Sequence, residues 1–151
     1  MCIDYCSLNS NTITDLWPLP WIDEKLARLH GAKYFSKLDL RDGYHQVPVK
    51  ESACFKMAFT CRYGTFEFNV MTFGFKNAPA HFQCSMNLLL ADLLDECVLV
   101  YMDDILIYSK TASEHGDHVK QVFACLNAKG WHVKQKKCAL FLPAVEFWGM
   151  L

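Results

Sequence analysis

The segment that decides the fold is Val98–Tyr108, which reads VLVYMDDILIY. Its apolar runs on either side of Met102-Asp103-Asp104 are typical of two buried strands joined by a tight turn. The two aspartates would then lie at the tip of an apolar hairpin, where like charges repel and apolar neighbours weaken hydration. A divalent cation would offset that repulsion, and carboxylate oxygens are ligands that suit Mg²⁺. The alternative is an ordinary polar turn, because aspartate is common in turns.

A third carboxylate stands in a similar position elsewhere in the chain. The segment Tyr34–Leu40 has a strand-like pattern, contains Asp39 near its end and is followed by the turn residues Asp42-Gly43. If this strand lies beside the hairpin, three carboxylates could hold two metal ions roughly 3.5 to 4 Å apart. Such a metal pair is the arrangement used in phosphoryl transfer.

Hydrophobic periodicity and turn residues predict the remaining elements. They are strand character at Met1–Tyr5, a helix at Ile22–Leu29, a hairpin formed by Ala53–Thr60 and Thr65–Val70, a helix from Pro79 to near Glu96, a helix from Ser113 to Ala128, and short strands at Trp131–Val133 and Val145–Trp148. The expected buried stripes of the two longer helices are Phe82, Met86, Leu89, Leu90 and Leu93, and Val119, Val122, Phe123 and Leu126. This order of strands and helices predicts an α+β fold, with helices packed on one face of an antiparallel sheet.

The composition predicts one folded domain. Of 151 residues, 52% are hydrophobic and 14% aromatic, which is enough to bury a sizeable core. With a net charge of -1, the chain lacks the excess of basic residues that is expected of a free-standing nucleic-acid binder. The eight cysteines are scattered along the chain and no two of them form a CxxC pair, so we expect them to be reduced thiols. The sequence shows neither an apolar run of about 18 residues nor a secretory leader. We therefore expect a cytoplasmic or nuclear location and do not expect a membrane partner.

Several further motifs accompany the aspartates in a fixed order. They are Asp4-Tyr5, Leu8-Asn9, Pro18-Leu19-Pro20, Phe35-Ser36-Lys37-Leu38-Asp39-Leu40, Gly43-Tyr44-His45-Gln46, Phe73-Gly74, Asn77 to Gln83, Tyr101 to Lys110, and Glu146-Phe147-Trp148-Gly149. Together they resemble the reverse transcriptase of Gypsy-class long-terminal-repeat retrotransposons over nearly the whole chain.

The resemblance implies a retroviral-type polymerase palm, with a ferredoxin-like antiparallel sheet and helices on one face, plus partial fingers. Residues 1–151 would be a single fragment of a reverse transcriptase domain, without thumb, connection or RNase H regions. It also implies RNA-directed DNA polymerase activity: transfer of a nucleotide from a dNTP to a primer 3′-hydroxyl on an RNA or DNA template. Two Mg²⁺ ions, with Mn²⁺ as a substitute, would assist this nucleotidyl transfer.

The same resemblance assigns roles to individual residues. The catalytic, metal-binding residues would be Asp39, Asp103 and Asp104. The nucleotide-binding residues would be Tyr44, Phe73, Gly74 and Lys137. The residues near primer or template would be Tyr101, Met102, Trp148 and Gly149. The bulk of Tyr44 would exclude a ribose 2′-hydroxyl, although ordinary core packing is the alternative, and Lys137 competes with a surface role and with its neighbour Lys136.

Three positions depart from the family pattern. Cys6 and Trp21 stand where the family usually has arginine, and Thr72 stands where it usually has proline. The two lost arginines and the expected absence of the other polymerase regions support a second hypothesis, a decayed and non-enzymatic remnant that folds but does not polymerise alone. A nucleotidyl cyclase is disfavoured because its Gly-Gly-acidic turn is absent. A zinc site at His115 and His118 is also disfavoured, since no further Cys or His completes a ligand set.

Overall fold

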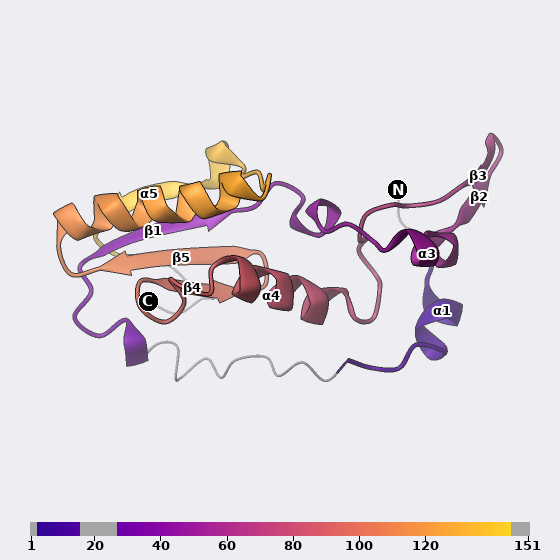
Figure 1. The fold of residues 1–151 in the computed structure, drawn as a ribbon, viewed down its shortest axis with the longest axis horizontal. Helices are drawn as coiled ribbons and strands as arrows, with labels where there is room; N and C mark the ends of the chain where they lie inside the picture. Colours follow the sequence, from indigo (N-terminus) through magenta and orange to yellow (C-terminus); the bar gives the residue numbers. More distant parts are fainter. Residues whose placement is uncertain (1–2, 16–26, 146–151) are drawn as a thin grey trace. The chain divides into compact units, whose positions relative to one another are not determined.

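A computed structural model describes residues 3–15 and 27–145, and their contacts divide into two compact units. One unit holds residues 3–15 and 42–82, and the other holds residues 27–41 and 83–145. Antiparallel sheets and helices are both present (Figure 1), so the predicted α+β class is confirmed.

The larger sheet belongs to the second unit and has four antiparallel strands in the order β4-β5-β1-β6. These strands are β1 (Tyr34–Asp39), β4 (Val98–Tyr101), β5 (Asp104–Ser109) and β6 (Ala139–Leu142). The strands predicted from the two apolar runs and from the segment around Asp39 are confirmed. Strand β6 was not predicted, because its short, half-exposed sequence carries no clear alternation.

Strand β5 is covered on both faces of the sheet. On one face Leu106 and Tyr108 belong to a core cluster of buried side chains. On the other face Ser36 of β1 and Ser109 of β5 contact α5 (Ala112–Ala128), which runs along these two strands in Figure 1. Burial on both sides explains why the β5 sequence is a continuous apolar run rather than an alternating one.

Helix α5 confirms the prediction of a helix that ends at Ala128, but it begins earlier than predicted. Its N-cap is Thr111 rather than Ser113, and Thr111 forms a capping box with Glu114. Its buried residues are His115, Val119, Val122 and Leu126. Phe123 is only half-buried, and the polar side chain of His115 takes a core position that the hydrophobic pattern did not indicate.

Helix α4 (Ala78–Leu89) starts as predicted, with Pro79 in its first turn. Phe82, Met86 and Leu90 are fully buried, as expected of its apolar stripe. The helix ends at Leu89 rather than near Glu96, while Leu89 and Leu93 are half-buried. The chain continues beyond it in tight turns.

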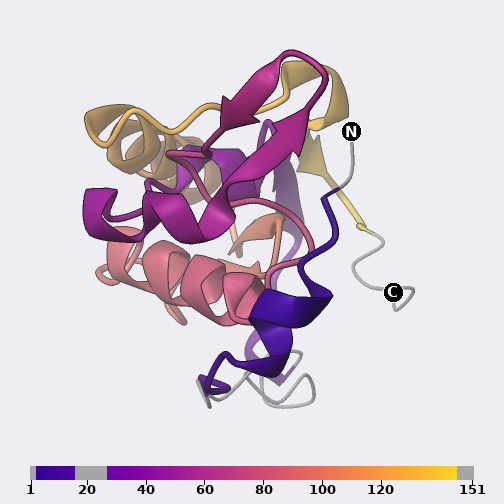
Figure 2. The same ribbon diagram turned by 90° about the vertical axis from the view of Figure 1, so that its right-hand side faces the viewer.

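The first unit contains a small hairpin, shown in Figure 2, made of β2 (Phe59–Cys61) and β3 (Gly64–Phe66). The predicted hairpin is therefore correct in kind but shorter. The strand predicted at Ala53–Thr60 is wrong over its first half, which forms α3 (Glu51–Cys54) and the 3-10 turn η2 (Phe55–Met57). Apolar residues at every second position imitated a strand there, but the polar residues that open α3 are poor strand formers.

The remaining predicted elements have mixed outcomes. The strand expected at Met1–Tyr5 is wrong in its described part, since residues 3–5 are irregular and lead into α1 (Cys6–Ser10). The strand expected around Trp131 is reduced to a single bridge between Leu40 and Val133. Most of the helix predicted at 22–29 and of the strand predicted at 145–148 lies outside the described residues.

Candidate functional site

The three predicted carboxylates lie at one end of the larger sheet. Asp39 is the last residue of β1 and Asp104 the first of β5, and the two are directly opposite in the antiparallel register. Opposite residues in such a pair have Cβ atoms only about 4.5–5.5 Å apart. Asp103 precedes Asp104 in the turn from β4. Strand pairing therefore brings together carboxylates that are distant in sequence.

The turn that carries Asp103 is unusually constrained. Tyr101 pairs with Asp104, so only Met102 and Asp103 connect β4 to β5. Met102 has a left-handed backbone with φ of 48°, which is strained for a residue with a side chain. The N–H of Met102 donates to Oε1 of the buried Gln83 at 2.9 Å, and this hydrogen bond fixes the turn.

Two lysines contact two of the three carboxylates, those of Asp104 and Asp39. Lys37 Nζ lies 2.8 Å from Asp104 Oδ2, and Lys137 Nζ lies 3.4 Å from Asp39 Oδ2. Lys37 and Asp39 point to the same face of β1, two residues apart, which places the ammonium diagonally opposite Asp104. Part of the negative charge at this end of the sheet is therefore balanced by the chain itself.

Asp103 differs from its two neighbours. Its side chain reaches solvent, yet its pKa is raised above the usual value, chiefly because protein around the carboxyl removes water from it. The negative charges of Asp104 and then Asp39 raise it further. Weakened hydration first and repulsion second thus raise the pKa of Asp103, and these are the two effects predicted for adjacent aspartates at an apolar tip.

The donor chemistry of this site fits Mg²⁺. Within residues 3–15 and 27–145, no group of three His, Cys, Asp or Glu side chains is gathered closely enough to enclose an ion. Mg²⁺ does not require such a cage, because it commonly takes one or two carboxylates and completes its shell with water and phosphate oxygens. A cation beside Asp103 would also offset both the lost hydration and the repulsion that raise its pKa.

The predicted nucleotide residues of the first unit lie together. The ring of Tyr44, in the 3-10 turn η1 (Gly43–Gln46), is 4.9 Å from the ring of Phe73 and 5.1 Å from that of Phe82. Tyr44 is largely buried, whereas Phe73 is 55% exposed. Tyr44 therefore does pack against the core, as the alternative held, and Phe73 offers the accessible ring.

Gly74 follows Phe73 with φ of 86°, a conformation that favours glycine. A Cβ there would be 3.7 Å from the ring of Tyr5, which is ordinary contact. The backbone conformation, rather than crowding, is thus the constraint on Gly74. Its carbonyl accepts a hydrogen bond of 2.8 Å from Asn9 Nδ2.

The other predicted residues fall in different places. Tyr101 is the last residue of β4 and Met102 lies in the turn beside Asp103, while Trp148 and Gly149 lie outside the described residues. Lys137 sits in the 3-10 turn η3 (Gln135–Lys137), and its ammonium contacts Asp39.

Sequence reasoning missed two residues of this site and the role of one histidine pair. Lys37 had a signal in its i,i+2 spacing from Asp39, but Gln83 had none beyond its place in a family motif. The disfavoured zinc pair His115 and His118 instead shares a hydrogen-bond partner, Ser109, whose hydroxyl lies 2.8 Å from Nδ1 of each ring.

In the part of the chain that the structure describes, no helix has the length and apolar character needed to cross a bilayer.

The chain is similar to a known protein family and to known relatives over nearly its whole length. The family model described as reverse transcriptase (RNA-dependent DNA polymerase) matches residues 1–151. The Tf2-3 and Tf2-7 transposon polyproteins of Schizosaccharomyces pombe are 42% and 41% identical to it over 149 residues, which is 99% of this chain but 11% of each polyprotein. The chain thus spans about a tenth of the length of these relatives.

Solved structures agree with the sequence relatives. The foamy viral protease–reverse transcriptase in complex with an RNA/DNA hybrid superposes with a TM-score of 0.87 at 30% identity, covering 97% of this chain and 20% of that one. Its complex with double-stranded DNA gives 0.82 at 29% identity, covering 99% and 31%. These matches confirm the retrotransposon-type resemblance, and the chain belongs to the reverse transcriptase (RNA-dependent DNA polymerase) family.

Proposed function

We propose that this chain supplies the catalytic palm and part of the fingers of an RNA-directed DNA polymerase. The observation that carries the proposal is the carboxylate end of the sheet, where Asp39 and Asp104 are opposite in register and Asp103 lies beside them with a raised pKa. These three aspartates would hold two Mg²⁺ ions, or Mn²⁺ in their place. When bound, such ions activate the attacking hydroxyl and stabilise the charge on the leaving pyrophosphate.

The chain's own residues have separate tasks in this proposal. Gln83 holds the turn of Asp103 in place through the N–H of Met102. Lys137, close to Asp39, is the group that would give a proton to the leaving pyrophosphate. The exposed ring of Phe73 would contact the incoming nucleotide, and Tyr44 behind it would exclude a ribose 2′-hydroxyl. Gly74 would let the backbone approach the nucleotide.

The proposed partners are a primer on an RNA or DNA template and a dNTP. The foamy viral relatives were solved with an RNA/DNA hybrid and with double-stranded DNA, which supports this class of substrate. Tyr101, Met102, Trp148 and Gly149 are the residues proposed to lie near the primer or template. Because the chain spans so little of its polyprotein relatives, we propose that it acts as part of a longer protein.

Primer extension on an RNA template, with Mg²⁺ or Mn²⁺, tests this function. The chain would be assayed alone and joined to the flanking regions of a related polyprotein. In the longer protein Asp103→Asn should lower the extension rate at least about 100-fold, because metal-bound charge stabilisation is worth several kcal/mol. The matched control is Asp117→Asn, since Asp117 is an exposed acid of α5 paired only with Lys120 among the described contacts. It should leave the rate unchanged.

Metal binding can be followed independently of activity. In a chain labelled with ¹³C at its methionine methyl groups, Mn²⁺ should broaden the signal of Met102, beside Asp103, more than that of the buried Met86. Asp103→Asn should reduce this broadening. Extension that survives Asp103→Asn would refute the metal-site assignment, whereas Mn²⁺ binding without extension in the longer protein would favour the non-enzymatic remnant.

A further inference from the structure

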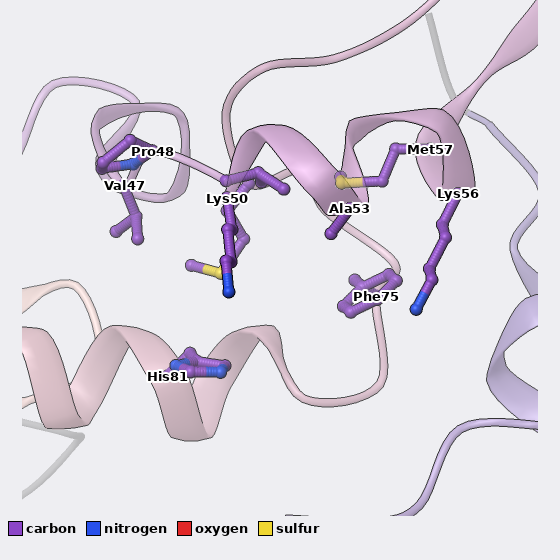
Figure 3. Close-up of a pocket in the computed structure, with 10 residues that line it drawn as sticks. Val47, Pro48, Lys50, Ala53, Lys56, Met57, Phe75 and His81 are labelled. Carbon is purple, nitrogen blue, oxygen red and sulfur yellow. The ribbon is translucent and has the colours of Figure 1, made fainter.

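A second candidate binding site lies wholly within the first unit, formed by residues that no proposed catalytic step uses. It is a pocket of about 360 Å³ lined mainly by apolar side chains (Figure 3). This volume falls in the range of small-molecule sites, which are typically concave and apolar with a few polar groups. The pocket is therefore large enough for an organic ligand of modest size.

The inner surface of the pocket suits a flat ring. Met57 and Met71 are only 3% and 4% exposed, and the ring of Phe75 lies beside them in the lining. Thioethers and aromatic rings both make favourable contacts with an aromatic guest. Aliphatic walls are added by Val47 and Ala53. Apolar surface of this kind favours the ring of a ligand over its charged group.

The scaffold of the pocket is held by backbone hydrogen bonds. Met71 N–H donates to the carbonyl of Val47 at 2.9 Å, and a β-bridge joins Pro48 to Val70, so two extended segments form one wall. A second wall is α3, where Ala53 N–H donates to the carbonyl of Lys50 at 2.7 Å. Such walls are formed before a ligand arrives, which reduces the entropy lost on binding.

The rim of the pocket is cationic. Lys50 and Lys56 are exposed at its edge, and their side chains extend toward the side on which Phe75 and His81 lie (Figure 3). None of the described residues that line the pocket is acidic. Two ammonium groups beside an apolar cavity favour a ligand that carries a negative charge at one end.

We propose that this pocket binds a small aromatic anion, with its ring against Met57, Met71 and Phe75 and its anionic group held by Lys50 and Lys56. The ligand is an aromatic ring bearing a carboxylate, sulfonate or phosphate. Such a unit could be a free small molecule or one unpaired nucleotide of a strand. The proposal does not depend on the polymerase function, because it uses no residue of the carboxylate site.

Methionine methyl NMR of the 151-residue chain tests the proposal with naphthalene-2-sulfonate as the probe. The probe should shift the ¹³C-methyl signals of Met57 and Met71 and leave that of Met86 in place. Replacing both lysines, as Lys50→Gln with Lys56→Gln, should weaken binding about tenfold or more, because charge-assisted contacts are lost. The matched control is Lys129→Gln, an exposed lysine outside the pocket, which should not change the affinity.

Two comparisons complete the test. The uncharged analogue 2-naphthalenemethanol should bind to the parent chain at least about tenfold more weakly than the sulfonate does. Its affinity should be the same for the parent chain and for the double variant, because it carries no charge for the lysines to hold. Deoxyadenylate and a deoxyadenylate hexamer separate the two sources: tighter binding of the hexamer assigns the site to a strand, and equal or weaker binding assigns it to a free molecule. Equal affinity for the sulfonate and its neutral analogue, or no shift at Met57 and Met71, would overturn the proposal.

Discussion

At the scale of single residues, Gln83 links α4 to the carboxylate turn. Its side chain is fully buried, accepts from Met102 N–H, and donates to the carbonyl of Val100 at 3.2 Å and to Asn87 Oδ1 at 2.9 Å. Gln83→Leu keeps a similar volume but leaves these partners without the amide. We expect the free energy of unfolding to fall by about 1–3 kcal/mol, the cost of unsatisfied buried polar groups. The amide of Met102 should also exchange its hydrogen faster.

Denaturant unfolding and hydrogen exchange would measure these two effects. Asn87→Ala is the matched control, because it removes one partner of Gln83 and leaves the hydrogen bond to Met102 intact. It should destabilise the chain less and leave the exchange of Met102 nearly unchanged. If Gln83→Leu did not accelerate exchange at Met102, the turn would be held by something other than this amide.

At the scale of whole elements, α5 shows what a capping box contributes. Glu114 N–H donates to Thr111 Oγ1, and Thr111 N–H donates to Glu114 Oε2, each at 3.3 Å. Thr111→Ala should lower the free energy of unfolding by about 1 kcal/mol, the usual effect of losing an N-cap. Ser113→Ala, at the exposed position that the sequence pattern first favoured as the cap, should change it by less than about 0.5 kcal/mol. Equal losses in thermal unfolding would contradict the assignment of Thr111 as the cap.

Some elements of the fold could be predicted from the sequence, and others could not. The apolar runs predicted β4 and β5 well, since both strands are largely buried. Strand β1 was predicted instead from its strand-like pattern and from the turn residues that follow it. The T-x-x-E signature of Thr111 to Glu114 was present and overlooked, because Ser113 was also a suitable cap. Strand β6 and the helical turns after Lys50 could not be found locally, since packing against distant segments decides them.

The candidate site also contains some residues that could be predicted from the sequence and others that could not. The sequence placed Asp103 and Asp104 at the tip of an apolar hairpin and Asp39 at the end of another strand, so the three could meet if the two strands were neighbours. Their lysine partners could not, since the contact of Lys37 with Asp104 depends on the exact strand register and that of Lys137 with Asp39 on a turn 98 residues away. The catalytic roles of all these residues stay predictions until activity is measured.

At the scale of the whole molecule, a buried chain of hydrogen bonds joins β6, β1, α5 and β5. Phe141 N–H donates to Ser36 Oγ at 3.1 Å, Ser36 Oγ lies 2.7 Å from His115 Nε2, and His115 Nδ1 lies 2.8 Å from Ser109 Oγ. One set of directions satisfies every group: Ser36 donates to Nε2, Nδ1–H donates to Ser109, and Ser109 donates to His118. That set requires a neutral His115.

The pKa of His115 agrees with this arrangement. It is lowered from the ordinary value of 6.5, first because burial disfavours the charged ring and second because His118 is close. In the unfolded chain His115 takes up a proton as the pH falls through about 6.5, whereas in the folded chain it resists protonation. The unfolded state then binds more protons, so the free energy of unfolding should fall as the pH is lowered from about 7 to 5.

A His115→Gln variant separates this effect from the other titrating groups. The variant should be less stable at pH 7, but its stability should fall less steeply between pH 7 and 5 than that of the parent chain. The difference in slope cannot exceed about 1.4 kcal/mol per pH unit, the limit for one proton. His30→Gln, at an exposed histidine, should keep the parent slope. Parallel stability curves for the parent and His115→Gln would show that His115 takes up its proton over the same pH range in the folded and the unfolded chain. That result would contradict a ring kept neutral by burial, and the charged ring would then donate from Nε2 to Ser36.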